Sequence, residues 1–399
     1  MQKILMLGGS PFQVPAIKKA VEMGYHVITC DYLPDNPGHA FSHEYHNVST
    51  TDKDAILNLA QRLRVDGIVC YASDPAATTA AYVCEQMGFP TNPYRSVEIL
   101  STKDKFRDFL LKNNFHTPKA KGYSDAREAI QEIGDFNVPV IIKPVDSSGS
   151  KGVTKFEGRG NLQQHIDYAL SFSRAKRVII EEFVEQNGYQ VAGDGFSVNG
   201  ELVFRCFAND HFDSRSDNPF VPVGASWPYI KPRAIHDAIH QEIQRLFTVL
   251  EMKTGASNFD VRIDDNNNVF LMEVGPRNGG NLIPQVIHYA TGVDLVEYTI
   301  KAAMGISCSD LKMKETVGFW AYHVVYSKRT GVLKGIHFDE RFRKNNLVEF
   351  EPYCRTGDRV EVFTGSNKTL GTMILKFDSM DEMLEKMENM MKWVQVEVE

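Results

Sequence analysis

Two carboxylates, Asp260 and Glu273, lie in a segment whose pattern predicts a β-hairpin. The polar run 265–268 (DNNN) is typical of a turn, and the runs on either side of it alternate between polar and apolar residues. Symmetric pairing about this turn places Asp260 opposite Glu273 and Arg262 opposite Leu271. The other face is then apolar, with Phe259, Val261 and Ile263 opposite Val274, Met272 and Phe270. A one-residue slip would bury the acids, so the pattern favours this register.

Facing side chains on paired strands lie about 5 Å apart at Cβ, where two carboxylates repel each other. A divalent cation between them, a shared proton or a neighbouring cation relieves such repulsion. Arg262 and Arg277 are close in the sequence, so a salt-bridged surface sheet is the alternative to a metal site. We expect the metal site.

A lysine and a glycine-serine loop form a second candidate site. Lys143 belongs to a predicted strand, VIIKP, and the loop 146–152 (DSSGSKG) follows it. Such a loop is rich in N–H and hydroxyl donors, and it folds over a polyphosphate while the lysine neutralises part of the charge. The loop is not a Walker P-loop, in which the Lys-Ser/Thr pair opens a helix. The alternative is a lysine on a solvated strand face.

Two further segments suggest nucleotide contacts. The apolar strand 178–184 (VIIEEFV) carries Glu181 and Glu182, and it offers backbone groups to an adenine edge and a carboxylate to the adenine amine. Residues 8–10 (GGS) lie between a predicted strand and a helix, where backbone N–H groups bind anions. The run GGSPFQ does not match the fingerprint GxGxxG, but Asp31 ends the second strand as a ribose-binding acid does. An NAD-dependent oxidoreductase is therefore an alternative.

The composition sets limits on the class of protein. The chain has 399 residues, 43% hydrophobic and 24% charged, which is typical of a globular protein of two or three domains. Its formal net charge of −7 argues against nucleic acid or an anionic membrane as a partner. The six cysteines form no CxxC motif and suggest reduced thiols. No leader or membrane-spanning run is apparent, so we expect a cytoplasmic protein.

The elements that must position these groups follow from periodicity. Residues 1–95 alternate strands (3–7, 26–30, 67–71) with helices (15–23, 54–64, 75–87), which predicts a parallel sheet. An amphipathic helix at 102–113 precedes a strand-rich stretch, with strands expected within 138–157 and at 178–184, 189–198 and 202–207. Helices are expected at 235–250, 283–290 and 295–304. After a linker at 305–316, short strands and a helix at 380–394 predict an α+β unit, with one apolar stripe formed by Met380, Met383, Met387 and Val394.

The order of these motifs resembles the ATP-grasp superfamily over the whole chain. The motifs are Lys105, Lys143, the strand end 181–184, Asp260-Val261-Arg262 and Glu273-Val274-Gly275-Pro276-Arg277. The resemblance implies α/β and α+β architecture, with a Rossmann-like preATP-grasp domain at 1–95 and a two-lobed ATP-grasp domain at 96–305. A flexible lid lobe is expected at about 118–184. The α+β domain at 316–399 is similar to the C-terminal domain of L-amino-acid ligases.

The resemblance also implies a role for each matching residue. Residues expected to bind ATP are Lys105, Lys143, Ser147, Ser148, Gly149, Gly152, Glu181, Glu182, Phe183, Val184 and Gln190. Asp260 and Glu273 would hold Mg²⁺ (or Mn²⁺). Gly275 stands where the family carries a metal-binding Asn, and Asn278 is the expected replacement. Gly188 stands where the family carries a ribose-binding acid, so Gln190 or Asp194 is expected to serve there.

Arg277 and Lys143 are the expected catalytic residues. The expected substrate residues are Gly9, Ser10, Asp74, Arg205, His211 and Arg277. The implied activity is an ATP-dependent ligase that activates a carboxylate as an acyl phosphate and joins it to an amine. A purine-biosynthetic carboxylase or formyltransferase is an alternative, and a non-catalytic nucleotide-binding protein is another. The expected partners are ATP and small-molecule substrates, with no nucleic acid and no membrane, and a homodimer is possible by resemblance.

Overall fold

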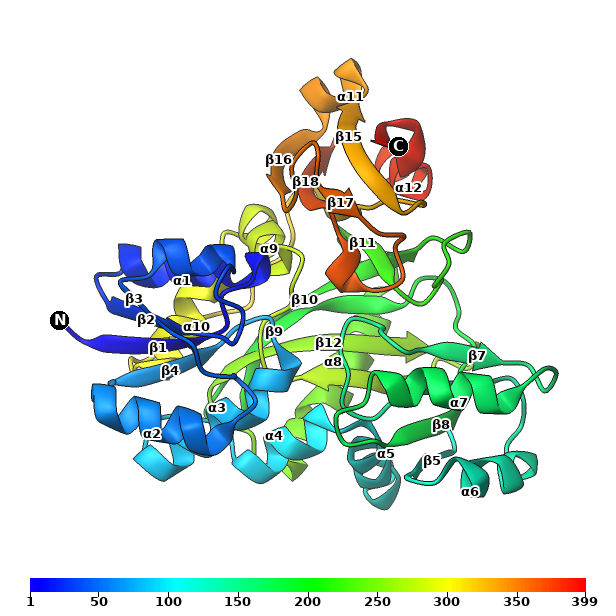
Figure 1. The fold of residues 1–399 in the computed structure, drawn as a ribbon, viewed down its shortest axis with the longest axis horizontal. Helices are drawn as coiled ribbons and strands as arrows, with labels where there is room; N and C mark the ends of the chain where they lie inside the picture. Colours follow the sequence, from blue (N-terminus) through cyan, green and yellow to red (C-terminus); the bar gives the residue numbers. More distant parts are fainter.

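The computed structural model describes residues 1–399. Three lobes surround a central sheet, with the N-terminal lobe at the left, a lobe of residues 120–182 at the lower right and the C-terminal lobe at the top (Figure 1). None of the helices combines the length and the apolar character needed to cross a membrane.

The N-terminal lobe is the predicted parallel sheet. Its strand order is β3-β2-β1-β4, formed by β1 (Lys3–Leu7), β2 (His26–Cys30), β3 (Glu44–His46) and β4 (Gly67–Cys70). The connecting helices are α1 (Val14–Glu22), α2 (Lys53–Leu63) and α3 (Asp74–Met87), with short 3-10 turns at Pro11–Gln13 and Pro37–Phe41. Each expected strand and helix is present, within one residue at the ends. Strand β3 has no counterpart in the prediction because its three residues are too few to show a pattern.

The lobe of residues 120–182, here called the lid lobe, has its own sheet and core. Its sheet order is β5-β8-β6-β7, formed by β5 (Ala120–Tyr123), β6 (Val140–Pro144), β7 (Thr154–Phe156) and β8 (Val178–Glu182). Apolar residues of alternate positions on β6 and β8 pack against α6 (Ala126–Gln131) and α7 (Leu162–Ser171). Lys143 and Glu181 occupy the intervening positions, so both face away from these helices. Helices α4 (Tyr94–Ser101) and α5 (Lys103–Lys112) join this lobe to the N-terminal lobe.

The central sheet runs through the rest of the molecule in the order β13-β12-β9-β10-β11-β14-β18-β16. Its members are β9 (Val191–Val198), β10 (Glu201–Phe212), β11 (Pro222–Trp227), β12 (Gly255–Ile263), β13 (Val269–Gly275), β14 (Phe319–Val325), β16 (Leu347–Pro352) and β18 (Gly371–Phe377). The associated helices are α8 (Arg233–Val249), α9 (Ile283–Thr291) and α10 (Leu295–Ala303). The sheet continues across the predicted linker, because β11 pairs with β14 and sets Gly224 beside His323.

The C-terminal lobe adds a small sheet of β15 (Gly331–Phe338), β17 (Arg359–Val360) and β19 (Val394–Val398), with α11 (Glu340–Asn345) and α12 (Met380–Glu388). Short 3-10 turns lie at Ser366–Lys368 and Met390–Lys392. The prediction of one helix over 380–394 is wrong, since α12 ends at Glu388 and Val394 begins a strand. The alternation in VQVEV explains this strand. Met383, Met387 and Val394 still share one core, as the apolar stripe predicted.

The acidic hairpin is β12 and β13, and its register agrees with the prediction only up to Asp260. Asp260 pairs with Glu273, and Phe259 pairs with Val274, as expected. A β-bulge then shifts the register, so Val261 pairs with Leu271, and Arg262 with Phe270 rather than with Leu271. The predicted apolar face is therefore wrong at Met272 and Phe270. The bulge leaves Met272 without a partner and turns it to the cleft, while Leu271 and Val269 enter the core.

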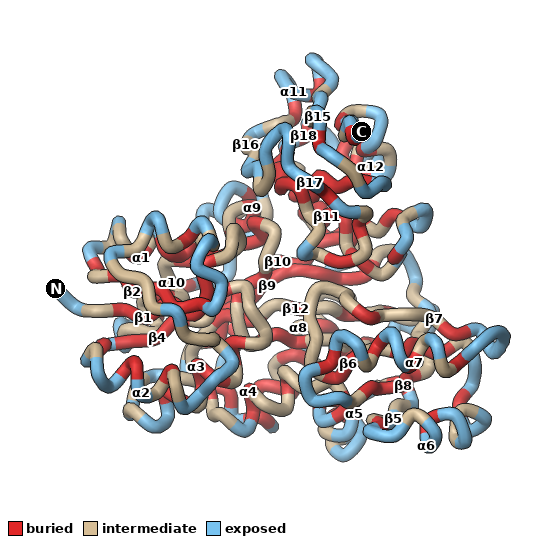
Figure 2. The backbone as a smooth tube through the Cα atoms, viewed as in Figure 1, coloured by how far each residue is buried: buried red, intermediate tan, exposed pale blue.

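The apolar face of the hairpin packs against α8 and α5, in the red interior of Figure 2. Phe259 has none of its surface exposed and lies against Phe247 of α8, with ring centroids 6.5 Å apart. Because this core supports the strand that carries Asp260, packing and site geometry depend on the same contacts.

We expect Phe259→Ala to lower the free energy of unfolding by about 3–5 kcal/mol, since a buried ring leaves a cavity when it is removed. Urea denaturation followed by circular dichroism measures this change. Phe41, whose surface is 43% exposed, is the matched control, and Phe41→Ala should cost about 0.5 kcal/mol or less. A loss of less than about 1 kcal/mol for Phe259→Ala would contradict the packing of the hairpin.

Candidate active site

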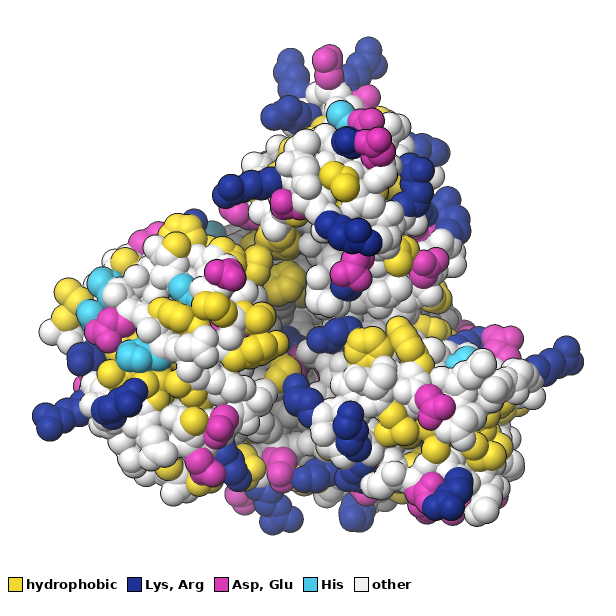
Figure 3. All heavy atoms as spheres, viewed as in Figure 1, with side chains coloured by type: hydrophobic (Ala, Val, Ile, Leu, Met, Phe, Trp, Pro, Cys, Tyr) yellow, Lys and Arg dark blue, Asp and Glu magenta, His cyan; other side chains and the backbone are white.

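A cleft lies between the lid lobe and the central sheet, with about 860 Å³ of space when its open mouth is included. It is lined by most of the residues expected to bind nucleotide or metal, namely Lys143, Ser147, Ser148, Gly149, Glu181, Glu182, Val184, Gln190, Asp260 and Glu273. Figure 3 shows the hollow between the lobes, with Lys and Arg side chains along its rim. Its lining places lysines and carboxylates side by side, which suits an anionic ligand that arrives with a cation.

A buried ion triad forms one wall of the cleft. Glu181 accepts a hydrogen bond from Arg107 at 2.9 Å and another from Lys143. Burial raises the pKa of Glu181, but Arg107 and Lys143 outweigh it and hold the pKa at about 2. Burial lowers the pKa of Lys143 to about 8, partly against the attraction of Glu181. Both Glu181 oxygens are thus engaged, although Glu181 was expected to accept from the adenine amine. The backbone that follows is also largely paired. The Glu182 N–H donates to the Lys119 carbonyl at 2.9 Å, the Phe183 N–H donates to the Pro139 carbonyl at 3.0 Å, and the Val184 carbonyl accepts from Arg262 at 2.7 Å.

Lys103, which the motif pattern did not single out, points into the cleft. Its ammonium donates to the Ser147 carbonyl at 2.7 Å and lies 3.5 Å from Glu273. Lys105, the expected phosphate contact, instead pairs with Glu98 at 3.2 Å and lines an adjoining cavity. Both lysines lie on the first turn of α5, where periodicity alone does not decide which of them faces the cleft.

The two hairpin carboxylates face each other at the floor of the cleft. Burial, followed by the charge of Glu273, raises the pKa of Asp260 to about 7. Oxygen ligands of this kind suit Mg²⁺, which takes one or two carboxylates and completes its shell with phosphate oxygens and water. No three His, Cys, Asp or Glu side chains gather to hold a metal without such help. The donor set therefore fits a magnesium ion that arrives with a polyphosphate.

Asn278, the expected third metal ligand, lies away from the cleft. It is fully buried, and its carbonyl oxygen accepts from the Thr299 hydroxyl at 2.7 Å. Gly152 and Phe183 also lie outside the lining. Gly152 packs behind the loop against Phe172 and Pro144, and the Phe183 ring has Lys155 and Arg262 over it.

Asp210, which the motif pattern did not single out, lies near Asp260 but outside the lining of the cleft. It lies on β10 and accepts from the Gln190 amide at 3.1 Å, while Arg262 donates to the other end of that amide at 3.1 Å. Burial and the neighbouring Asp260 raise the pKa of Asp210 well above its ordinary value. An acid within the largely apolar run FRCFANDHF was the available signal. Asp194, the other candidate for the ribose, is buried away from the cleft and accepts from the Gly279 amide at 2.8 Å.

Arg205 and His211, which were expected to bind substrate, make their contacts outside the cleft. Arg205 donates to Asp237 of α8 at 3.2 Å. His211 bonds to Ser226 at 2.8 Å, its ring lies 5.0 Å from that of Tyr189, and burial lowers its pKa to about 3. Both occupy positions of β10 that alternate with Asp210, so the strand turns them to the opposite face of the sheet.

The remaining expected substrate residues lie in the N-terminal lobe or bridge to it. Asp74 accepts two hydrogen bonds from Arg277, at 2.7 and 2.6 Å, and lines the cavity that shares Lys103 and Glu273 with the cleft. The backbone N–H of Gly9 donates to Asp31 at 3.3 Å. The Ser10 hydroxyl and N–H both donate to Gln13. Arg277 and Asp74 thus connect the N-terminal lobe to the end of β13, beside the carboxylate pair.

Comparison with known protein families finds two domains in the chain. An ATP-grasp domain matches residues 136–285, and L-amino acid ligase C-terminal domain 2 matches residues 323–399. Both agree with the resemblance seen in the motifs.

Individual proteins show the same likeness. The chain is 25% identical over 379 residues to the formate-dependent phosphoribosylglycinamide formyltransferase of Prochlorococcus marinus (strain MIT 9301), covering 92% of this chain and 93% of that protein. It is 26% identical over 274 residues to the protein y4rH of Sinorhizobium fredii, covering 67% of this chain but 55%, about half, of that protein. The crystal structure of L-amino acid ligase from Bacillus licheniformis has a TM-score of 0.83 at 16% identity, covering 100% of this chain and 99% of that one, which shows a shared fold.

The raised pKa of Asp260 predicts a pH dependence of stability. Between pH about 4 and pH about 7 the folded chain retains a proton that the unfolded chain has released, so stability falls as pH rises through this window. From pH 5 to pH 8, without added metal, we expect the natural protein to lose about 1–2 kcal/mol more than Asp260→Asn. Urea denaturation at each pH measures the difference. Asp265→Asn, in the exposed turn, is the control and should follow the natural protein; the same behaviour of Asp260→Asn would refute the prediction.

The two lysines of α5 provide a matched pair. Lys103→Ala should weaken MgADP binding about tenfold, because it removes a charge beside Glu273 and the bond to Ser147. Lys105→Ala should change it less than about twofold, since that ammonium pairs outside the cleft. Titration calorimetry measures both affinities. A larger loss for Lys105→Ala would favour the original motif assignment.

Proposed function

We propose, on the premise that this chain is an ATP-grasp ligase with a C-terminal domain of the L-amino-acid-ligase type, that it joins a small carboxylic acid to an amine at the cost of ATP. The observation that carries the proposal is the convergence of Lys103, Lys143, Asp260 and Glu273 on one cleft beneath the loop 146–152. Two cations and two acids placed so closely suit a polyphosphate with its magnesium.

The chemistry follows from positioning and charge. A carboxylate oxygen of the first substrate attacks the γ-phosphorus of ATP, ADP leaves, and an acyl phosphate forms. The amine then attacks the acyl carbon and phosphate leaves, which gives the amide. Lys103 and Lys143 reduce the repulsion between the carboxylate and the triphosphate.

Asp260 and Glu273 would hold Mg²⁺, which supplies charge neutralisation at the phosphate oxygens when bound. The loop 146–152 would exclude water from the acyl phosphate. Arg277 would steady the transferred phosphoryl group or the substrate carboxylate from beside the cleft. Because Asp74 already binds its guanidinium in two places, Arg277 is held in one orientation.

A second candidate function rests on the likeness, over 92% of this chain, to a formate-dependent phosphoribosylglycinamide formyltransferase. In that case formate would be the activated acid and a phosphorylated amine the acceptor. The match of residues 323–399 to the ligase C-terminal domain favours the amino-acid ligase reading.

Boundaries, assembly and location complete the proposal. We place the preATP-grasp domain at 1–95, the ATP-grasp domain at 96–305 and the C-terminal domain at 316–399. The only support for a homodimer is family likeness, and sedimentation would test it. A cytoplasmic location is supported by six cysteines that are all free.

A phosphate-release screen tests the function. At saturating MgATP, carboxylates that include formate and amino acids are each paired with mixed amines, and phosphate release above the ATP-only level identifies a substrate. ATP binding without release across the panel would favour a non-catalytic nucleotide-binding protein instead.

Glu273→Gln should reduce that phosphate release by about 100-fold or more, because even loss of an outer partner of a metal site costs about 10- to 100-fold. The circular dichroism spectrum and melting temperature should stay close to those of the natural protein. Glu201→Gln, an exposed change at the first residue of β10, is the control and should retain full activity. Retained turnover in folded Glu273→Gln would contradict the assignment.

A further inference from the structure

Two segments far apart in the sequence hold the glycine-serine loop, residues 146–152, here called the lid loop. One is the segment 213–221 after β10, and the other is residues 363–366 of the C-terminal lobe, here called the latch loop. The Ser366 N–H donates to the Gly149 carbonyl at 3.2 Å. The Ser150 hydroxyl donates to the Phe220 carbonyl at 2.8 Å. The lid loop is therefore closed by residues outside its own lobe.

Asn218 joins these three segments. Its amide nitrogen donates to the Ser150 carbonyl at 2.9 Å and to the Thr364 carbonyl at 3.0 Å. Its amide oxygen accepts from the Phe220 N–H at 3.1 Å. The side chain is only 5% exposed, so these bonds are shielded from water. One side chain thus ties the lid loop to the latch loop.

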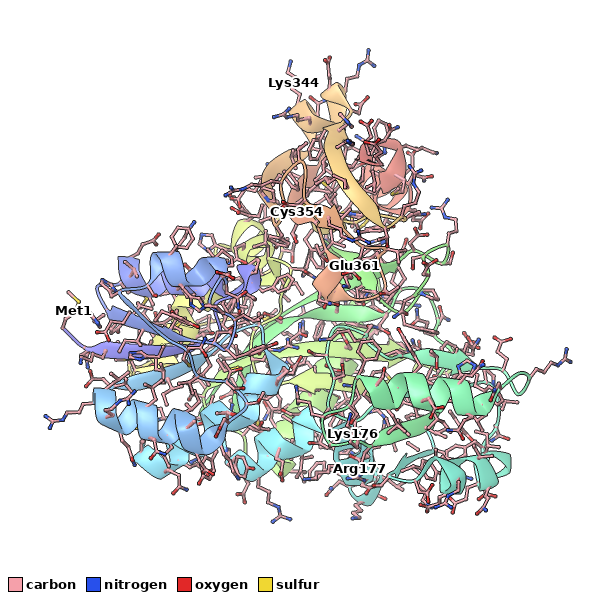
Figure 4. All side chains as sticks on the ribbon, viewed as in Figure 1. Met1, Lys176, Arg177, Lys344, Cys354 and Glu361 are labelled. Atoms are coloured by element: carbon pink, nitrogen blue, oxygen red, sulfur yellow. The ribbon has the colours of Figure 1, made fainter.

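The latch loop has a firm support of its own. Phe363 is buried at 1% exposure, and its ring stacks on Tyr326 with centroids 4.6 Å apart. The Phe363 N–H donates to the Ser327 carbonyl at 3.0 Å, and the Tyr326 hydroxyl donates to Asp213 at 2.8 Å. Figure 4 labels Glu361, just before this loop, at the end of the C-terminal lobe that faces the rest of the molecule. The latch loop is thus fixed to the central sheet just beyond β14.

The same contacts reach the nucleotide cleft. Phe220 and Pro222 line it together with Ser147, Ser148 and Gly149 of the lid loop. A movement of Asn218 would therefore shift both the lid loop and the wall of the cleft that Phe220 and Pro222 form.

We propose that Asn218 is a positioning residue for nucleotide binding, which holds the lid loop against the latch loop of the C-terminal lobe. The inference rests on the proposed function, in that the lid loop covers the phosphates. If Asn218 has this role, the C-terminal lobe helps to retain the nucleotide, although it is far from the lid loop in the sequence.

The test compares Asn218→Ala with the unaltered chain of 399 residues. MgADP affinity, measured by titration calorimetry, should fall about tenfold, which corresponds to about 1.4 kcal/mol. Amide hydrogen exchange in residues 146–152 should become faster without any ligand, since the lid loop has lost its support. The global melting temperature should change little, whereas the exchange rate of this loop should rise clearly.

Asn346→Ala is the matched control. Asn346 is equally buried, at 2% exposure, and bonds to Lys376 and Glu382 within the C-terminal lobe, away from the lid loop. A purely structural effect would lower MgADP affinity in both variants alike. Only Asn218→Ala should weaken binding and speed exchange in the lid loop.

Ser366→Pro is a second variant that acts on the backbone. It removes the N–H donated to Gly149, and proline is tolerated because Ser366 opens a 3-10 turn and Gly365 before it is extended. It should reproduce the faster exchange of the lid loop and the weaker MgADP binding.

The outcomes separate the two hypotheses. Unchanged exchange in the lid loop of Asn218→Ala and Ser366→Pro would overturn the positioning role, as would equal losses in Asn346→Ala. Failure of the unaltered protein to bind MgADP would overturn the proposed function, while the exchange measurement would still report on the latch.

Discussion

The whole site depends on one buried guanidinium. Arg107 of α5 donates to Glu181 of the lid lobe and to the backbone carbonyls of Leu271 and Met272 in the acidic hairpin. It therefore links three elements that would otherwise separate around a polar cleft. Burying such charges is costly unless every one is paired, and here Lys143 completes the pairing of Glu181. The triad sets the distance between the lid lobe and the carboxylate pair.

The bulge in the hairpin depends on this arrangement. Met272 has no cross-strand partner, so its carbonyl is free to accept from Arg107 at 2.9 Å. In a regular strand successive carbonyls point to opposite sides, whereas here those of Leu271 and Met272 both accept from Arg107. The extra residue thus satisfies the guanidinium and at the same time turns the Met272 side chain to the cleft. The bulge in the hairpin and the contact with the distant Arg107 therefore have one explanation.

Sequence patterns predicted those parts of the site that one strand or one loop determines. The facing of Asp260 and Glu273 followed from alternation, because a slip would have buried both acids. The bulge was not predictable, since apolar Met272 fits either face. Lys103 and Lys105 were indistinguishable for a similar reason, as both begin the same helix and only the packing of α5 decides between them. The positions of Asp210 and His211 could not be predicted because the sequence does not show which face of β10 is turned towards the cleft. That depends on how α8 covers the sheet.

The pairing of β11 with β14 has a consequence for the integrity of the chain. Gly224 and His323 are neighbours in one continuous sheet, although a linker separates their segments in the sequence. A chain shortened at that linker would leave β11 as a naked edge, with its N–H and C=O groups open to other molecules. Such an edge promotes self-association, so the segment after the linker protects the rest of the chain against aggregation. The segments on the two sides of the linker therefore form one folding unit, since they share this sheet.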